Sequence, residues 1–176
     1  RPFRFYKYAP GFGFAPVVVT AAEQSGTNPL PRVHHVADPF KTRVRSADWH
    51  LERFIRRFIL PGAHGIQWAN YAARVCEREI DAARESGDRV ILYSTFPPLG
   101  THIAALRVAT KCSVPWVADF RDPFVTDAVR YLNSLGLRVA NYLERRMMQT
   151  AALVIVNTEE AREEWTSRYP HAADKI

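Results

Sequence analysis

Short apolar runs alternate with longer amphipathic stretches along this chain, and that alternation predicts its fold class. The four clearest runs are apolar at most positions, which is typical of strands that are buried on both faces. They lie at 16–20, 89–94, 114–119 and 153–157. The stretch 21–48 contains three prolines and is predicted to be a long loop with one short strand at 33–36.

The segments between these runs carry helical spacing and helix-end signals. Gly87 ends the segment at 66–86, and Thr158 followed by two glutamates is an N-terminal capping pattern. The predicted helices are 1–9, 49–60, 66–86, 99–111, 127–150 and 159–168. Strands that alternate with helices predict an α/β protein with a Rossmann-like parallel sheet and helices on both faces.

Length and charge limit the classes of protein that fit. A chain of 176 residues with 47% hydrophobic and 24% charged residues suits one domain with an ordinary core. The net charge of +6 comes from an excess of arginine, which suits phosphate or carboxylate ligands, an anionic membrane surface or nucleic acid. No nucleic-acid-binding module is recognisable, so nucleic acid is not an expected partner.

Several other classes lack their sequence signals. Cys76 and Cys112 have no metal-ligand spacing, which favours free thiols in the cytoplasm over a disulfide. The pair His34-His35 points to opposite sides of a strand and lacks a third ligand, so no metal site is expected. No apolar run reaches about 18 residues, the length of a membrane-spanning helix. P-loop and α/β-hydrolase motifs are absent from the sequence.

The first polar cluster follows the run at 89–94. Ser94 and Thr95 end a strand, Pro97 and Pro98 turn the chain, and His102 falls in the first turn of the next helix. Backbone N–H groups at that helix start are suited to hold an anion, so the functional interpretation of the cluster is a substrate or phosphate rim. The alternative is structural, with hydroxyl caps and a histidine on a helix face.

The second cluster follows the run at 114–119, where the sequence reads Asp119-Phe120-Arg121-Asp122-Pro123. Ligands of open α/β sheets bind at the carboxyl ends of strands. Two carboxylates there suit a base or a hydroxyl-orienting group, and Arg121 suits a phosphate. Asp119 still belongs to the strand, so Asp122 is the better candidate to face a ligand. The alternative is that Arg121 pairs with an acid and only fixes the loop.

The third cluster is a basic segment over residues 41–58, in which six positive and two negative side chains give a charge of +4. Trp49, Arg53, Arg56 and Arg57 are its candidate membrane contacts, because a basic helix with aromatic residues can lie on an anionic membrane. The alternative is a helix that packs its Phe and Ile side chains on the sheet and exposes its arginines.

Three blocks in order resemble the N-terminal domain of family-4 glycosyltransferases. They are STFPPLGTHIAAL, VPWVADFRDPF and AALVIVNTEEAREEW. The resemblance covers residues 89–176 closely and 1–20 loosely, whereas 21–88 are not distinctive. It implies a GT-B enzyme, in which two Rossmann-like domains enclose the active site. It also implies transfer of a sugar from a nucleotide-sugar donor to a glycan or lipid-linked acceptor, with retention and without a metal or other cofactor.

The resemblance assigns the acceptor side of the cleft to this domain. Asp122, His102 and Asp119 are then the expected catalytic residues, and Ser94, Thr95, Pro97 and Arg121 the expected substrate-binding residues. The donor is expected to bind mainly to a C-terminal domain that would follow residue 176. A first strand with a glycine-rich loop is expected before Arg1, so residues 1–176 are interpreted as a single Rossmann-like domain shortened at both ends.

Two other functions stay open. The chain is alternatively a non-catalytic binding module that docks to an anionic membrane or a partner through the basic segment. A weaker alternative is a GT-B epimerase that acts on a nucleotide sugar. The expected location is the cytoplasm, with peripheral attachment to the inner face of the plasma membrane left open by the basic segment.

Overall fold

A computed structural model describes residues 2–21, 30–38, 47–60, 64–122, 124–125 and 134–176. The strands are β1 (Val18–Ala21), β2 (Val33–Val36), β3 (Leu92–Phe96), β4 (Trp116–Phe120) and β5 (Leu153–Val156). The α-helices are α1 (Pro2–Tyr8), α2 (Ala47–Phe54), α3 (Ile66–Glu85), α4 (Leu99–Cys112), α5 (Ser134–Thr150) and α6 (Glu159–Arg168). Shorter helical turns are η1 (Ala9–Phe12), η2 (Ile55–Ile59) and η4 (Pro170–Lys175).

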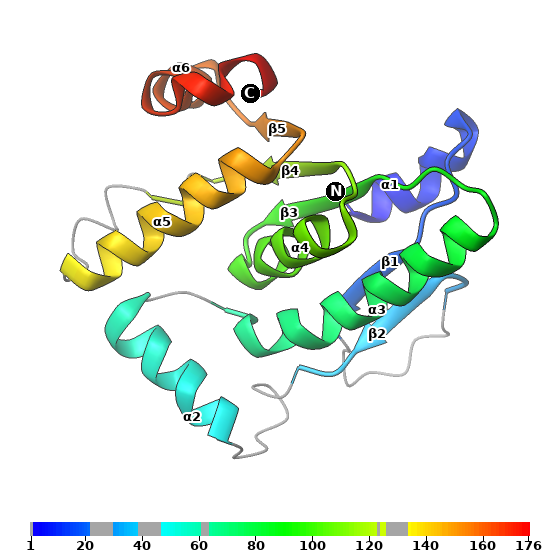
Figure 1. Cartoon of the computed structure of the whole chain (residues 1–176), viewed down its shortest axis with the longest axis horizontal. Coiled ribbons are helices and arrows are strands. Elements are labelled where there is room, and N and C mark those ends of the chain that lie inside the picture. Colours follow the sequence, from blue (N-terminus) through cyan, green and yellow to red (C-terminus); the bar gives the residue numbers. More distant parts are fainter. Residues whose placement is uncertain (1, 22–29, 39–46, 61–63, 123, 126–133) are drawn as a thin grey trace.

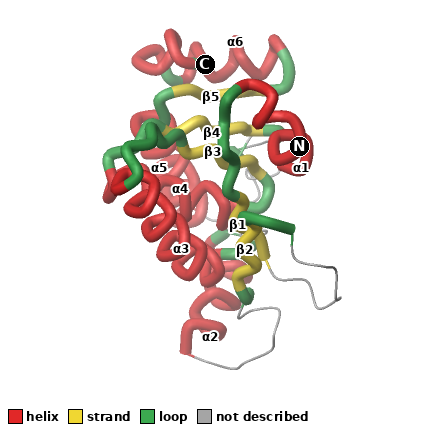
Figure 2. Tube along the Cα trace, turned by 90° about the vertical axis from the view of Figure 1, so that its right-hand side faces the viewer, coloured by secondary structure: helices red, strands yellow, loops and turns green. Residues whose placement is uncertain are grey.

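The strands pair in parallel, which confirms the predicted α/β class. They form a two-stranded sheet, β1-β2, and a three-stranded sheet, β3-β4-β5. In Figures 1 and 2 the two sheets lie next to each other, and β1 is the strand of the smaller sheet nearest to β3 of the larger one. The predicted single sheet is therefore divided, because no strand of the described residues pairs with both β1 and β3.

Helices cover both faces of the larger sheet, as predicted. On one face, α4 packs over β3 and β4, and its His102 is hydrogen-bonded to Ser94 of β3. On the other face, Phe5 of α1 lies against Tyr93 of β3, with ring centroids 4.7 Å apart. Figure 2 shows α3, α4 and α5 on one side of the strands and α1 on the opposite side.

The central strand of the larger sheet, β4, forms the middle of the core. Four of its five residues are buried, and Trp116 and Phe120 contribute the largest side chains. Met147 and Met148 of α5 and Trp165 of α6 complete the same apolar cluster. A strand that is covered on both faces and paired on both edges has no position for solvated polar side chains.

Element boundaries differ from the predictions most clearly at two places. The strand predicted at 89–94 runs instead over Leu92–Phe96, because its pairing with β4 begins at Leu92 and extends to Phe120. The helix predicted at 127–150 is described from Ser134 onward, and residues 127–133 lie outside the described part of the chain. The short strand predicted at 33–36 is confirmed as β2.

Candidate functional site

The carboxyl ends of β3, β4 and β5 bring the predicted polar blocks together. The register pairs Phe96 with Phe120 and Phe120 with Val156, so the residues that follow the three strands meet at one edge of the sheet. The Arg121 N–H donates to the Phe96 carbonyl at 3.2 Å, and the Asn157 side chain donates to the Arg121 carbonyl. We call this edge the strand-end rim, formed by residues 95–97, 120–122 and 157.

Four of the predicted site residues lie on the rim. Pro97, Arg121 and Asp122 are exposed, and Thr95 is half-buried. The Thr95 hydroxyl is buried and has no hydrogen-bond partner within the described residues. The rim thus exposes the Arg121 guanidinium, which can bind a phosphate or a carboxylate, and the Asp122 carboxylate, which can accept a hydrogen bond from a hydroxyl.

His102 lies behind the rim, in the core. Its side chain has no solvent exposure, and its ring is surrounded by aromatic rings, the nearest being Phe120 at 4.4 Å between centroids. His102 Nδ1 and Ser94 Oγ are hydrogen-bonded at 2.8 Å, and Trp116 Nε1 donates to the same Ser94 oxygen at 2.8 Å. Burial lowers the pKa of His102 to about 3, so its imidazole is neutral at pH 7.

Asp119 is also fully buried, on the opposite face of the sheet from His102. Its Oδ2 accepts the hydroxyl hydrogen of Tyr93 at 2.5 Å. The expectation that His102, Asp119 and Ser94 face an open cleft therefore differs from the structure, in which all three are buried. In this arrangement the three buried residues position the strand ends, and the residues of the strand-end rim are the ones accessible to a ligand.

The start of α4 also differs from the expectation. The Gly100 N–H, which was expected to be available to an anion, donates to the His64 carbonyl at 2.9 Å. Gly65 lies so close that a Cβ added to Gly100 would stand 2.2 Å from the Gly65 carbonyl oxygen. The chain at 64–65 therefore covers this helix terminus.

Sequence reasoning missed Glu144, a fully buried acid on α5. Its carboxylate accepts the Val125 N–H at 2.9 Å, the Tyr169 hydroxyl at 2.7 Å and an Arg168 N–H at 3.1 Å. Val125 follows the rim by three residues, so Glu144 fixes the rim loop to α5 and to the C-terminal segment. The only sequence signal was a glutamate beside apolar positions of a long helix.

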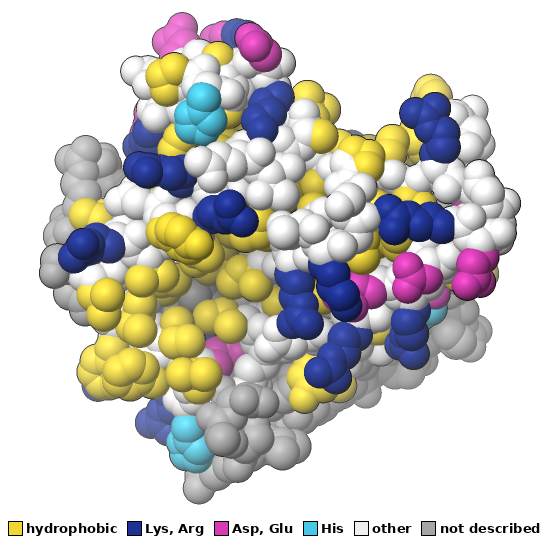
Figure 3. Space-filling view, viewed as in Figure 1, with side chains coloured by type: hydrophobic (Ala, Val, Ile, Leu, Met, Phe, Trp, Pro, Cys, Tyr) yellow, Lys and Arg dark blue, Asp and Glu magenta, His cyan; other side chains and the backbone are white. Residues whose placement is uncertain are grey.

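The basic segment is described from residue 47 onward. Arg53 lies over the ring of Trp49 at 5.3 Å, and Arg57 lies over Phe58 at 5.7 Å. Ile55 and Ile59 pack on the core, whereas Leu51, Phe54 and Phe58 are each more than half exposed. The predicted packing of the phenylalanines on the sheet is therefore wrong. Figure 3 shows a broad hydrophobic area where α2 and the first half of α5 lie.

Comparison with protein-family models, with curated proteins and with solved structures finds no match. Among the described residues no group of three or more His, Cys, Asp or Glu side chains is arranged to hold a metal ion. The described helices include none with the length and apolar character needed to cross a membrane. Cys76 and Cys112 are free and half-buried.

Proposed function

We propose that this chain is the acceptor-side domain of a glycosyltransferase that uses a nucleotide-sugar donor. The observation that carries the proposal is the strand-end rim, where an exposed Arg121 and Asp122 follow a buried central strand. Carboxyl ends of parallel strands are where α/β proteins bind ligands. The three sequence blocks that resemble family-4 glycosyltransferases each supply one part of this rim.

The rim residues suit specific steps of sugar transfer. The Asp122 carboxylate would orient the acceptor hydroxyl and receive its hydrogen bond. The Arg121 guanidinium would bind a phosphate of the donor or of a lipid-diphosphate acceptor. His102 and Ser94 would act as positioning residues, because their hydrogen bond ties the start of α4 to β3 behind the rim.

Paired substitutions test this assignment in the natural protein that contains the chain. Asp122→Ala is expected to lower kcat for sugar transfer by about a hundredfold, the usual scale for a lost acid–base group. Asp88→Ala is the matched control, because Asp88 is an exposed acid at the opposite, amino end of the strands. Equal activity of Asp122→Ala and the control would refute the role of the rim.

The divided sheet bears on the domain organisation. Helix α3 packs on β1, α4 packs on β3, and the two helices pack on each other. Packed helix axes lie about 8–10 Å apart and paired strands about 4.7–4.9 Å apart, so the strands beneath two packed helices, here β1 and β3, are expected to lie about two strand spacings apart. We infer that one further parallel strand fits between them, which gives the doubly wound order of Rossmann folds.

Helix α1 supports the inference that this strand precedes α1 in the chain. It contacts β3 through Phe5, its Tyr6 hydroxyl donates to the Pro31 carbonyl beside β2, and it leads into β1. A strand directly preceding α1 would complete a right-handed crossover to β1. Amide hydrogen exchange of β1 and β3 should slow by about tenfold or more in protein that carries its natural upstream sequence. Unchanged exchange in both strands would contradict this inference, and β5 serves as the internal control.

A second candidate function, membrane docking, is favoured by one observation. Leu51, Phe54 and Phe58 are exposed at helical spacing, and they lie among the arginines of the basic segment. Replacing Phe54 and Phe58 by Ser should abolish sedimentation with vesicles that contain anionic lipid, whereas the exposed Phe12→Ser serves as the control. Sedimentation that persists without both phenylalanines would exclude this surface.

A further inference from the structure

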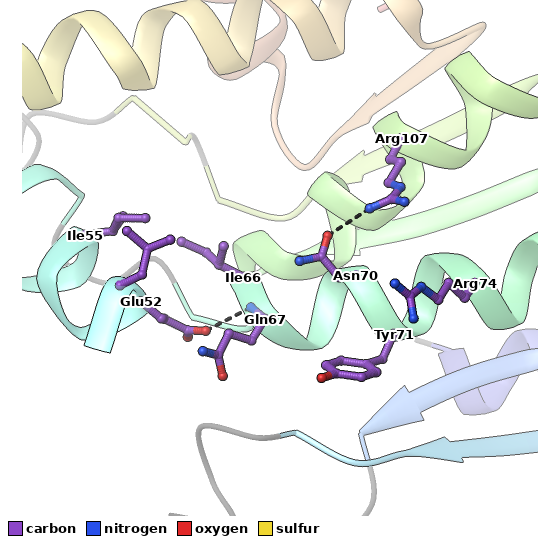
Figure 4. A pocket seen from close by; sticks show the side chains of 9 residues that line it. Glu52, Ile55, Ile66, Gln67, Asn70, Tyr71, Arg74 and Arg107 are labelled. Atoms are coloured by element: carbon purple, nitrogen blue, oxygen red, sulfur yellow. Dashed lines mark hydrogen bonds between the residues drawn. The ribbon is translucent and has the colours of Figure 1, made fainter. Parts of the chain in front are cut away.

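A cavity of about 300 Å³ lies between α2, α3 and α4, away from the strand-end rim. Its walls come from one face of α3, from the inner side of α2 and from Arg107 of α4. Figure 4 shows Glu52 and Gln67 at one end and Arg74 and Arg107 at the other. A volume of about 300 Å³ is at the lower end of the range for small-molecule sites.

The Glu52–Gln67 end of the cavity contains buried polar atoms without partners. Glu52 is 1% exposed and Gln67 is 5% exposed. Glu52 Oε2 accepts the Gln67 N–H at 2.9 Å, but Glu52 Oε1 and both side-chain amide atoms of Gln67 have no partner within the described residues. Leaving a buried hydrogen-bonding atom unpaired is costly, so these three atoms are suited to receive a polar ligand.

The opposite end of the cavity is cationic. Arg74 is exposed and makes no ion pair in the described part of the chain, and Arg107 donates to Asn70 Oδ1 at 2.9 Å. The Arg107 Nε lies 3.9 Å from Glu77, which also pairs with Lys111 at 2.6 Å. Two guanidinium groups that face one cavity favour an anionic group such as a phosphate or a carboxylate.

We propose that this cavity binds a small anionic polyol, such as a sugar phosphate or a sugar acid. Its hydroxyls donate to Glu52 Oε1 and to the Gln67 amide oxygen, and one of them accepts the Gln67 amide N–H. Rotation about the broad terminal torsion of Gln67 turns the amide oxygen and nitrogen toward the bound molecule. The anionic group lies between Arg74 and Arg107. The inference is independent of the proposed glycosyl transfer.

Titrations of the full chain by ¹⁵N NMR test the proposal with four probes: glucose 6-phosphate, gluconate, glucose and inorganic phosphate. Glucose 6-phosphate or gluconate should produce saturable shifts at the Gln67 and Asn70 side-chain amides and bind at least about tenfold more tightly than glucose or phosphate. The tighter of the two anionic probes identifies the preferred anion. The absence of saturable shifts with both would overturn the proposal.

Variants distinguish a specific binding site from nonspecific attraction of anions to a basic protein. Arg74→Gln should weaken binding about tenfold, and Glu52→Gln should weaken it by a similar factor. Arg78→Gln is the matched control, because Arg78 is exposed one turn further along α3 and does not line the cavity. A melting curve checks that each variant folds. If Glu52→Gln does not fold, the comparison of Arg74→Gln with the control is sufficient. Equal weakening by Arg74→Gln and Arg78→Gln would overturn the proposal.

Discussion

The buried His102 should make the folded chain lose stability in acid. Its folded-state pKa is about 3 because of burial, whereas an unfolded histidine has a pKa of about 6.5. Below pH 6.5 the unfolded chain binds a proton that the folded chain excludes, so stability falls until the pH reaches about 3. One proton corresponds to about 1.4 kcal/mol per pH unit, and the unfolded histidine is already half protonated at pH 6.5, so about 2.3 kcal/mol should be lost between pH 6.5 and 4.5.

Urea unfolding at several pH values between 7 and 4.5 measures this loss, with His102→Gln as the comparison. Glutamine does not titrate and retains an amide that can hydrogen-bond Ser94, so the variant should lack this part of the acid destabilisation. Subtracting the two curves removes the contribution of the other five histidines. Parallel curves for the two proteins would refute the burial of a neutral imidazole behind the rim.

Three further predictions concern the core. Gly100→Ala should lower the free energy of unfolding, measured by urea titration, by about 3 kcal/mol or more, because the added Cβ would stand 2.2 Å from the Gly65 backbone. Gly11→Ala should lower it far less, because no atom lies within 4 Å of a Cβ added at Gly11. Burial raises the pKa of Cys76 to about 11, so its labelling by a thiol reagent should be slow at pH 8 and accelerate toward pH 11; labelling at pH 8 as fast as a free thiol would contradict this. Glu144→Leu should cost about 3–5 kcal/mol in thermal or urea unfolding, because the Val125 N–H, the Tyr169 hydroxyl and one Arg168 N–H all lose their acceptor; a loss below about 1 kcal/mol would show that the Glu144 contacts do not hold the C-terminal segment.

The sequence was sufficient for the parts of the fold that depend on local pattern. The apolar run before Asp119 predicted a strand buried on both faces, and the polar clusters that begin at Ser94 and Asp119 were predicted at the ends of parallel strands. The carboxyl ends of parallel strands share an edge, and the observed register, which places Phe96 beside Phe120, brings the two clusters together there.

Other features depend on contacts between distant segments, which pattern alone does not encode. His102 was predicted in the first turn of α4, but its direction was set by the aromatic side chains of β3 and β4 that surround it. Helical spacing could not distinguish the two apolar sides of the basic segment, of which the isoleucine side is packed and the phenylalanine side is exposed. The cavity at Glu52 and Gln67 requires the docking of α2 on α3.

Product identity tests the central proposal most directly. The natural protein that contains this chain would be incubated with a panel of uridine and guanosine diphosphate sugars and with glycan and lipid-linked acceptors, and the products identified by mass spectrometry. We expect a glycosylated acceptor together with a free nucleoside diphosphate, and strong loss of both in Asp122→Ala. A free epimerised nucleotide sugar, or unchanged substrates across the whole panel, would contradict it.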